Sequence, residues 1–175
     1  DIVVAHMGVT IGGAIGAAFY VWNSVLKKPR SFVMDHAYWG PEFSEDEIRA
    51  VLGERAGEFT KENCRIEKIE DENLLCQKTV ERMAQGKVVG WFQGRMEFGP
   101  RALGNRSILG NPASRGVADM INAQIKYRER WRPFCPSMLD TIASDILQTT
   151  HPTPYMTFTF DVADRWKPRI PEVVH

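Results

Sequence analysis

Cysteine and histidine are scarce in this sequence, and neither is arranged as a metal site. Among 175 residues there are three cysteines and four histidines, with no C-x-x-C and no H-x-x-x-H spacing. Metal centres and disulfide frameworks depend on such close spacings. We therefore expect Cys64, Cys76 and Cys135 to be buried or unreactive thiols, and we assign no metal ligand.

Long apolar runs and net charge are also missing. No run approaches the roughly 18 apolar residues that span a membrane, and the first residues lack the basic segment of a signal peptide. The 22 basic and 22 acidic residues cancel, while 43% of the residues are hydrophobic and 25% are charged. This composition is typical of a soluble globular domain, so we expect a cytoplasmic protein without a membrane partner.

Two common phosphate-binding signatures are absent, yet one segment has the composition of an anion-binding loop. The sequence contains no G-x-x-x-x-G-K-[ST], and no G-x-G-x-x-G follows the apolar segment 87–92. Residues 93–106 nevertheless read QGRMEFGPRALGNR. The glycines allow sharp turns, and the guanidinium groups match phosphate or carboxylate. Because 87–92 is β-branched and aromatic, we expect a buried strand that leads into this loop.

Positive charge is concentrated in residues 93–132. This stretch contains eight basic and three acidic residues, a net charge of +5 in a chain whose overall net charge is zero. A local basic tract in a neutral protein favours a discrete anionic ligand over a surface that coats nucleic acid. Two simpler interpretations stay open: an ordinary surface turn whose arginines pair with neighbouring acids, or a solvated charged face.

Apolar periodicity and capping residues predict helices interleaved with strands. Ser44 and Glu47 form a capping box that begins a helix ending at Gly53 or Gly57, and Asp71 caps a second helix. The remaining expected elements are helices at 12–26, 119–125 and 143–147 and strands at 65–69, 134–139 and 155–162. The mixture predicts the α/β (α+β) class.

Both ends of the chain indicate a piece of a longer protein. The sequence begins with Asp1 rather than Met, and it stops within an extended, strand-like run at 169–175. The helix at 12–26 is rich in small residues that permit close packing against a partner. We therefore expect some functional residues to lie outside this sequence.

Two motifs together resemble one known family. The segment QGRMEFGPRALGNRSIL at 93–109 is followed by INA at 121–123 and by K-x-R-E-x-x-R-P-F at 126–134. These residues resemble the NodU/CmcH-type carbamoyltransferases, and the likeness covers residues 38–175. The resemblance implies that 38–175 is an incomplete C-terminal, YrdC-like domain, with a twisted mixed sheet and flanking helices, truncated at its C-terminus.

The resemblance also implies a role for the first 37 residues. Residues 1–28 would be the last helix of a preceding transfer domain of the actin/sugar-kinase superfamily, and 29–37 would be a linker. In the family that preceding domain holds a divalent metal such as Fe²⁺. The acidic ligand that usually stands just before this helix is absent from the turn Met7–Gly12, so no metal ligand is assigned here.

For the C-terminal domain, the resemblance implies an ATP-dependent O-carbamoyltransferase. The domain would bind ATP, with Mg²⁺, and carbamoyl phosphate, and would form carbamoyl adenylate. Its own N-terminal transfer domain would then carbamoylate a hydroxyl of a small molecule or an oligosaccharide. Physical chemistry agrees, because two phosphate-bearing substrates repel each other and need several fixed cations to meet.

Positions that match the family motif give the candidate site. Arg101 would contact phosphate, and Lys126 and Arg132 would bind the nucleotide phosphates or carbamoyl phosphate, so these three are the catalytic candidates. Met156 would lie near the adenine. The remaining binding candidates are Arg95, Gly99, Asn105, Arg106, Ser107, Asn122 and Arg128.

Several of these residues have an alternative structural role. The basic residues that are equally expected to be salt-bridged scaffold are Arg95, Arg128 and Arg130. The polar residues whose alternative role is to fix the loop are Asn105, Ser107 and Asn122. We expect Trp91, Phe98 and Phe134 to be core residues rather than stacking platforms.

The same charge supports hypotheses of other classes. YrdC-like domains have relatives in tRNA modification, so an RNA-binding module is the alternative function. The expected strands do not expose interleaved aromatic residues for base stacking, so we expect no nucleic-acid partner. The third hypothesis is a fragment that is inactive on its own.

Overall fold

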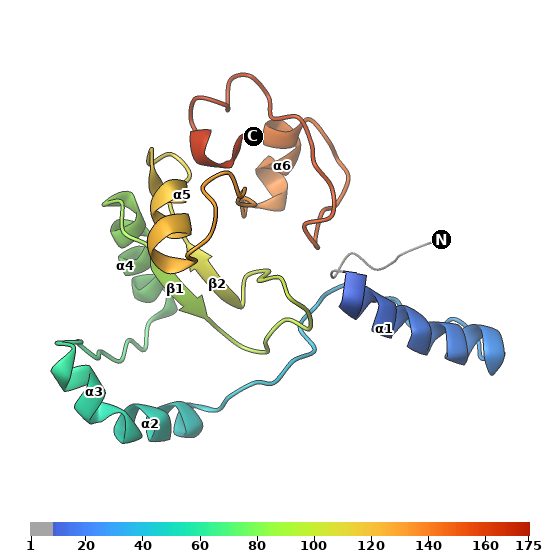
Figure 1. The fold of residues 1–175 in the computed structure, drawn as a ribbon, viewed down its shortest axis with the longest axis horizontal. Coiled ribbons are helices and arrows are strands. Elements are labelled where there is room, and N and C mark those ends of the chain that lie inside the picture. The colour runs from blue at the N-terminus through green and yellow to red at the C-terminus, as the bar shows by residue number, and fades with distance from the viewer. Residues whose placement is uncertain (1–8) are drawn as a thin grey trace.

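The structure is a computed structural model that describes residues 9–175. Its elements, in chain order, are α1 (Val9–Phe19), η1 (Tyr20–Val25), α2 (Glu45–Glu54), α3 (Ala56–Lys61), α4 (Glu72–Ala84), β1 (Val89–Phe92), β2 (Arg106–Leu109), α5 (Val117–Met120), η2 (Ile121–Ile125), α6 (Asp140–Leu147) and η3 (Pro171–Val173). Figure 1 shows the β1–β2 pair near the centre, with α4 and α5 beside it. The α+β class is therefore confirmed.

The sheet is a single antiparallel pair. Val89 lies opposite Leu109 and Phe92 lies opposite Arg106. The strand expected at 87–92 is confirmed as β1, while β2 was not expected, because its sequence is part of the glycine- and arginine-rich motif. The two strands place residues 93–105 as the loop of a hairpin.

Local hydrogen bonds explain where the helices begin. The Ser44 side chain accepts a hydrogen bond from the Glu47 amide, and the Glu47 carboxylate accepts one from the Ser44 amide, so the capping box before α2 is confirmed. The carboxylate of Asp71 accepts from the Asn73 and Leu74 amides and begins α4, as expected. The helix expected at 119–125 is also confirmed by α5 and η2, which run on without a break.

Three expected strands are wrong. Residues 65–69, 134–139 and 155–162 have no ladder partner in the described structure, where β1 and β2 pair only with each other. A run of alternating residues becomes a strand only when another strand edge is available to complete its hydrogen bonds. In 155–162, moreover, Met156 adopts a left-handed backbone with φ +55°, which interrupts an extended conformation.

The last two helices differ from expectation in extent. The expected helix at 143–147 is confirmed in α6, but α6 begins three residues earlier, at Asp140. The strand-like run at 169–175 is instead a short 3-10 turn, η3, in which proline occupies the first turn. Proline fixes its own φ and has no amide hydrogen, so it suits such a turn better than a ladder.

Part of the core lies between the end of β2 and the α5–η2 helix. Val117 and Ile121 are buried, and both press on Gly110, which directly follows β2. A Cβ at Gly110 would lie 3.1 Å from Ile121 Cδ1 and 3.2 Å from Val117 Cγ2. This contact fixes the helix against the hairpin, and with it the two segments that carry the basic tract.

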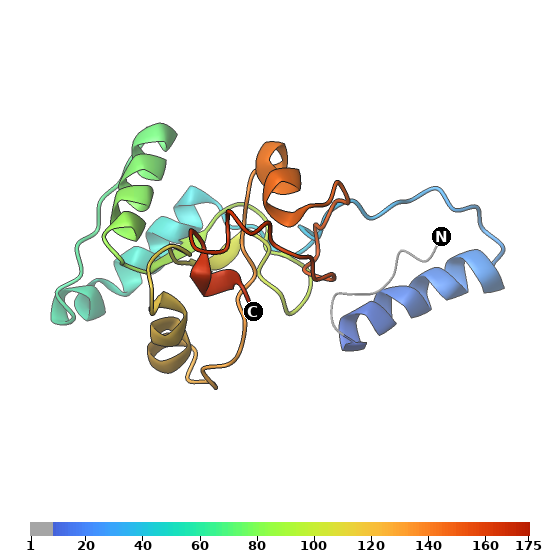
Figure 2. The same ribbon diagram turned by 90° about the horizontal axis from the view of Figure 1, so that it is seen from above.

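Helix α1 and η1 project away from the rest of the molecule (Figures 1 and 2). Large apolar side chains on η1 are exposed, including Tyr20, Trp22 and Val25. The turn expected to lack the acidic ligand lies partly outside the described residues. The assignment of 1–28 to a preceding domain stays a prediction, as does the linker at 29–37.

Two expectations about burial are wrong. Cys64, Cys76 and Cys135 are all exposed rather than buried, while the expectation that they are unreactive stays a prediction. Phe98 is 40% exposed instead of belonging to the core, because the loop that carries it stands at the end of a two-stranded hairpin. Among residues 9–175, no helix has the length and hydropathy that a membrane crossing requires.

Packing at Gly110 gives a first prediction. Gly110→Ala should loosen η2, because a methyl group must displace Ile121 or Val117 in a contact with little free space, at a cost of about 1–3 kcal/mol. Hydrogen–deuterium exchange should show faster exchange of the 121–125 amides. Gly53→Ala is the matched control, because nothing lies within 4 Å of a Cβ there and alanine favours the helix. Unchanged protection in Gly110→Ala would contradict the proposed packing.

Candidate functional site

The hairpin loop at 93–105 is organised around one buried carboxylate. Glu97 is 3% exposed. Its Oε1 accepts hydrogen bonds from the backbone amides of Leu103 at 2.6 Å and Asn105 at 2.8 Å, and its Oε2 pairs with Arg106 Nε at 3.2 Å. One side chain therefore satisfies two amides and one guanidinium, and it bends the loop back on itself.

The surroundings of Glu97 favour its charged form. Burial acts to raise its pKa, but hydrogen bonds from the Asn105, Leu103 and Glu97 amides, with the charge of Arg106, outweigh burial and lower the pKa below the ordinary 4.5. A lowered pKa in the folded state means that ionised Glu97 stabilises the loop. This stabilisation is present above pH 4.5 and is lost as the pH falls through the folded-state pKa.

Arg106 and Asn105 belong to the internal scaffold of the loop. Arg106 Nη2 also donates to the Gly99 carbonyl, so this guanidinium is engaged on both sides. Asn105 Nδ2 donates to the Arg95 carbonyl at 2.7 Å and its Oδ1 accepts from Gln93 Nε2 at 3.2 Å. For these two candidates the structure places the side chains toward the loop itself.

The other loop candidates are divided between scaffold and surface. Ser107 Oγ accepts a hydrogen bond from the Gly104 amide at 3.1 Å, and Arg95 Nε donates to the Gly40 carbonyl at 3.1 Å. Gly99 and Gly104 have φ values of +129° and +116°, which favour glycine at both bends. Residues 99–102, where the chain bends after Gly99, are here called the 99–102 turn.

Arg101 stands at the tip of this turn and is available to a ligand. Its side chain is exposed, and within the described part of the chain it makes no hydrogen bond or ion pair. The backbone amides of Gly99, Arg101 and Ala102 are likewise without an acceptor among residues 9–175. Three amide hydrogens and one guanidinium next to each other form an arrangement suited to an anion.

A second polar group is built around Asn122. Asn122 is fully buried at 0% exposure, on the first turn of η2. Its Nδ2 donates to the carbonyls of Arg130 at 3.2 Å and Arg132 at 3.1 Å, and its Oδ1 accepts from Arg128 Nε at 2.6 Å. Asn122 therefore fixes the course of the basic segment 126–132, and its side chain does not reach the surface.

The basic residues of 126–132 differ in how they are engaged. Arg128 is bound to Asn122 and lies over the Phe134 ring at 4.8 Å, so Phe134 supports a protein cation while being half-buried. Arg132 Nε pairs with Glu129 at 3.2 Å on the surface. The Lys126 side chain is exposed and, in the described structure, its ammonium group has no hydrogen-bond or ion-pair partner. Lys126 is thus the second uncommitted cation of the candidate set.

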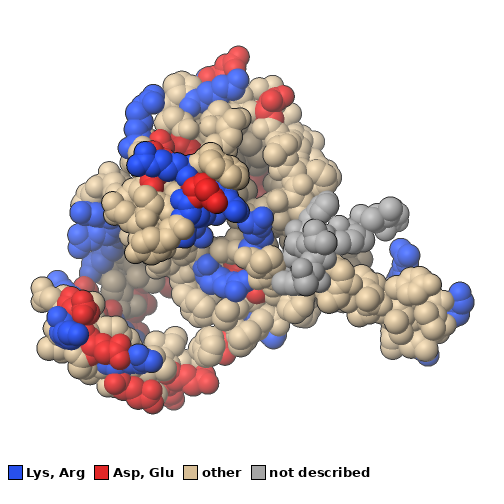
Figure 3. All heavy atoms as spheres, in the orientation of Figure 1, with Lys and Arg blue, Asp and Glu red and all other residues tan. Residues whose placement is uncertain are grey.

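The candidate residues form two groups and one separate position. Within residues 9–175 no hydrogen bond or ion pair joins the hairpin loop to segment 126–132. The β2–Gly110–Ile121 packing is the structural link between them. Met156, 42% exposed, lies on a third segment. Figure 3 shows that basic side chains gather on the face near α5 and the hairpin loop.

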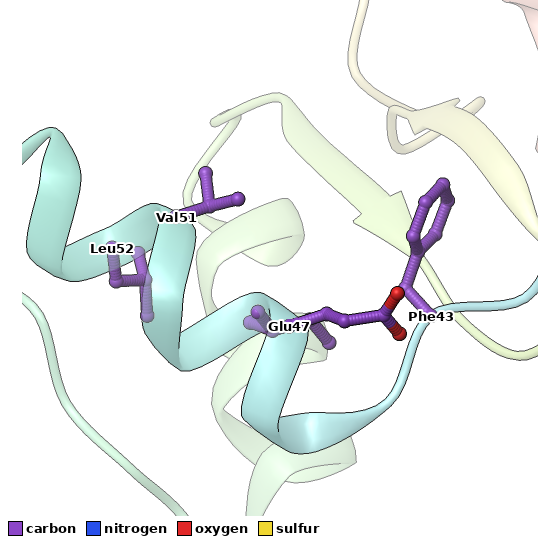
Figure 4. A pocket seen from close by; sticks show the side chains of 5 residues that line it. Phe43, Glu47, Val51 and Leu52 are labelled. Carbon is purple, nitrogen blue, oxygen red and sulfur yellow. The ribbon is translucent and has the colours of Figure 1, made fainter.

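A separate apolar cavity lies along α2, away from the candidate residues. It has a volume of about 290 Å³ and is lined by Phe43, Glu47, Ile48, Val51 and Leu52 (Figure 4). None of the predicted site residues lines it. No cluster of three or more metal-binding side chains is found in the part of the chain that the structure describes.

Comparison with known proteins places the motifs in a family. Residues 80–175, more than half of the chain, match the model of the carbamoyltransferase C-terminus. The chain belongs to this family. The matched range includes the whole hairpin loop, the α5–η2 helix and the basic segment 126–132. The candidate site therefore lies in the part of the chain that matches the carbamoyltransferase C-terminus.

Relatives share most of the chain but are much longer. The protein is 42% identical over 166 residues to the uncharacterized protein sll1178 of Synechocystis, covering 92% of this chain and 26% of that protein. It is 36% identical to nodulation protein NolNO of Sinorhizobium fredii, covering 100% of this chain and 25% of that protein. Nodulation protein U of Rhizobium tropici is 44% identical over 53% of this chain and 16% of its own length. This chain thus spans about a quarter of the length of the first two relatives.

The sequence pattern did not mark Glu97 as part of the site. An available signal was its position as the only acidic residue among three arginines in 93–106. A lone carboxylate in a basic loop is expected to be neutralised by its neighbours, and here it is also taken up by two amides. The Leu103 and Asn105 amides are therefore committed to Glu97 and are not available to a ligand.

Glu97 gives a second prediction. Lowering the pH below 4.5 should release the Leu103 and Asn105 amides, because protonation removes the charge that their hydrogen bonds favour. In an NMR titration, both amide resonances should move with one midpoint below 4.5. Glu97→Gln should abolish that titration and weaken the loop by about 1.5–3 kcal/mol for a lost charge-assisted bond. A midpoint above 4.5 would contradict the lowered pKa of Glu97.

Proposed function

We propose that this carbamoyltransferase domain binds ATP and carbamoyl phosphate and forms carbamoyl adenylate. The observation that carries the proposal is the turn at 99–102, where Arg101 and three amides without an internal acceptor lie together. Lys126 supplies a second free cation on the other basic segment. The family match supports the transfer chemistry, and the uncommitted cations support phosphate-bearing substrates.

The proposed chemistry needs positioning and charge more than a side-chain nucleophile. Hydrolysis of carbamoyl phosphate first gives carbamate and inorganic phosphate. A carbamate oxygen then attacks the α-phosphorus of ATP. The new P–O bond forms as the bond to pyrophosphate breaks, and carbamoyl adenylate results. Arg101 and Lys126 would hold the negative oxygens and stabilise their charge in the transition state. Mg²⁺ would enter with the nucleotide and act as a Lewis acid on its phosphates.

Transfer of the carbamoyl group to an acceptor hydroxyl is assigned to residues outside this chain. The relatives are about four times longer, since this chain covers 26% and 25% of two of them. Two of the three relatives described above are named nodulation proteins. The acceptor class that we propose, from the resemblance of the motifs to the carbamoyltransferases, is an oligosaccharide or a small molecule. A divalent metal such as Fe²⁺ belongs, in this proposal, to the preceding domain.

Substitution of the free cations gives a third prediction. Arg101→Ala or Lys126→Ala in the full-length protein should slow pyrophosphate release ten- to a hundredfold or more, because each lost phosphate contact costs about 1.5–3 kcal/mol. The control is Arg130→Ala, whose exposed guanidinium lies 3.9 Å from Asp119 and belongs to a weak surface pair. A variant of Arg101 or Lys126 with wild-type pyrophosphate release would remove that residue from the proposed site.

Single-stranded RNA binding is the second candidate function, and one observation favours it. Tyr127 and Trp131 are 84% and 75% exposed within the basic segment 126–132, an arrangement that permits base stacking. From the sequence we expected no interleaved aromatic residues exposed on strands. Tyr127 and Trp131 lie outside the strands, on the segment 126–132. Their presence makes a direct comparison of the two ligand classes necessary.

Salt dependence separates the two functions and gives a fourth prediction. In isothermal titration calorimetry of the full-length protein, the affinity for a non-hydrolysable ATP analogue and for carbamoyl phosphate should fall only modestly as the salt concentration rises. RNA binding would instead weaken steeply, because many counterions are released along a phosphate backbone. Absence of nucleotide binding at millimolar ligand would refute the leading proposal. RNA binding that weakens steeply with salt, with a lower affinity in Trp131→Ala, would support the alternative.

A further inference from the structure

Residues 36–41, here called the strap, run alongside the hairpin loop. The strap follows the extended segment that leads from η1 to the rest of the molecule (Figure 1). Three main-chain hydrogen bonds join strap and loop: the Phe98 amide to the Ala37 carbonyl at 2.6 Å, the Gly40 amide to the Met96 carbonyl at 2.9 Å, and the Met96 amide to the Pro41 carbonyl at 2.9 Å. The strap therefore behaves as a short additional edge of the loop.

The contact between strap and loop is close, and its centre is buried. Ala37 is only 2% exposed. A Cβ on Gly40 would lie 2.8 Å from the Met96 carbonyl oxygen, so the two backbones meet at a distance that only glycine allows. Arg95 Nε adds a hydrogen bond to the Gly40 carbonyl. Such a contact leaves the strap and the loop little freedom to move independently.

Tyr38 extends this attachment to the turn that carries Arg101. Its hydroxyl donates to the Leu103 carbonyl at 2.9 Å, and the Leu103 amide is held by Glu97 at 2.6 Å. Both backbone groups of Leu103 are thus fixed, two residues beyond Arg101. Because the amides of the 99–102 turn make no hydrogen bonds of their own among the described residues, Leu103 is an anchor for the turn.

A run of aromatic rings leads from α1 to the strap. The Phe19 ring at the end of α1 lies 6.0 Å from Phe32, and Phe32 lies 5.7 Å from Trp39. The His36 ring then stacks on Trp39 at 4.8 Å and on Tyr38 at 5.6 Å. Ring contacts at these separations are attractive and define relative positions.

We infer that Tyr38 is a positioning residue for Arg101, and that the aromatic run links the placement of α1 and η1 to ligand binding at the 99–102 turn. The inference rests on the proposed function, since it concerns the phosphate-bearing ligand of that turn. Coupling of this kind is reciprocal, so ligand binding also favours one placement of α1. The apolar side chains of η1 are exposed. The placement of α1 and η1 therefore depends on the part of the full-length protein that contacts these side chains.

Removal of one hydroxyl tests the positioning role. In the full-length protein, Tyr38→Phe should raise the KM for carbamoyl phosphate about three- to tenfold, the effect of one lost hydrogen bond, and leave kcat nearly unchanged. Hydrogen exchange at 102–105 should quicken. Trp166→Phe is the matched control. It also removes one side-chain hydrogen bond, from Trp166 Nε1 to the Asp145 carboxylate at 2.9 Å, but this bond does not involve the hairpin loop. Equal KM values in the two variants would overturn the inference.

A second pair of variants tests the aromatic run. Phe32→Ala should also raise the KM for carbamoyl phosphate, although Phe32 does not touch the loop, whereas Val33→Ala, 76% exposed beside it, should not. A wild-type KM in Phe32→Ala would overturn the link to α1. Arg101→Ala distinguishes failure of this inference from failure of the proposed function. If Arg101→Ala weakens binding of carbamoyl phosphate and Tyr38→Phe does not, only this inference is wrong. If neither variant weakens binding, the proposed function is wrong.

Discussion

The carboxylate of Glu97 is the interaction on which the candidate site depends. It is buried, yet it remains charged because two amides and the Arg106 guanidinium surround it. Charge-assisted hydrogen bonds of this kind are stronger than neutral ones and are costly to break in a buried position. By closing the loop at 97 and 103–106, Glu97 leaves the 99–102 turn as the part that faces outward, with Arg101 at its tip.

Arginines in one basic tract carry out different tasks according to their partners. Arg106 is used inside the loop, Arg128 is held by Asn122 and lies over Phe134, and Arg101 has no partner in the described chain. Buried carboxylate and amide groups thus act as the framework that holds the free cations in place. A net charge of +5 over 93–132 therefore overstates the number of cations that a ligand meets.

Much of the local structure was predictable because its causes are local. The Ser44–Glu47 capping box, the Asp71 cap and the apolar run of β1 each depend on residues within a few positions of one another. Segment 155–162 was not predictable in the same way, because a strand requires a distant partner and Met156 takes a left-handed backbone. Likewise, the exposure of Phe98 and of the three cysteines depends on which elements pack over them.

The sequence by itself determined the α+β class, the main helices, and the family to which the motifs at 93–109 and 126–134 belong. These features follow from composition, short-range periodicity and contiguous motifs. Only the tertiary structure decided which candidate side chains are scaffold and which are free. That distinction rests on contacts across long separations in the chain, such as Tyr38 with Leu103 and Gly40 with Met96, which bring together backbone groups that no local pattern pairs.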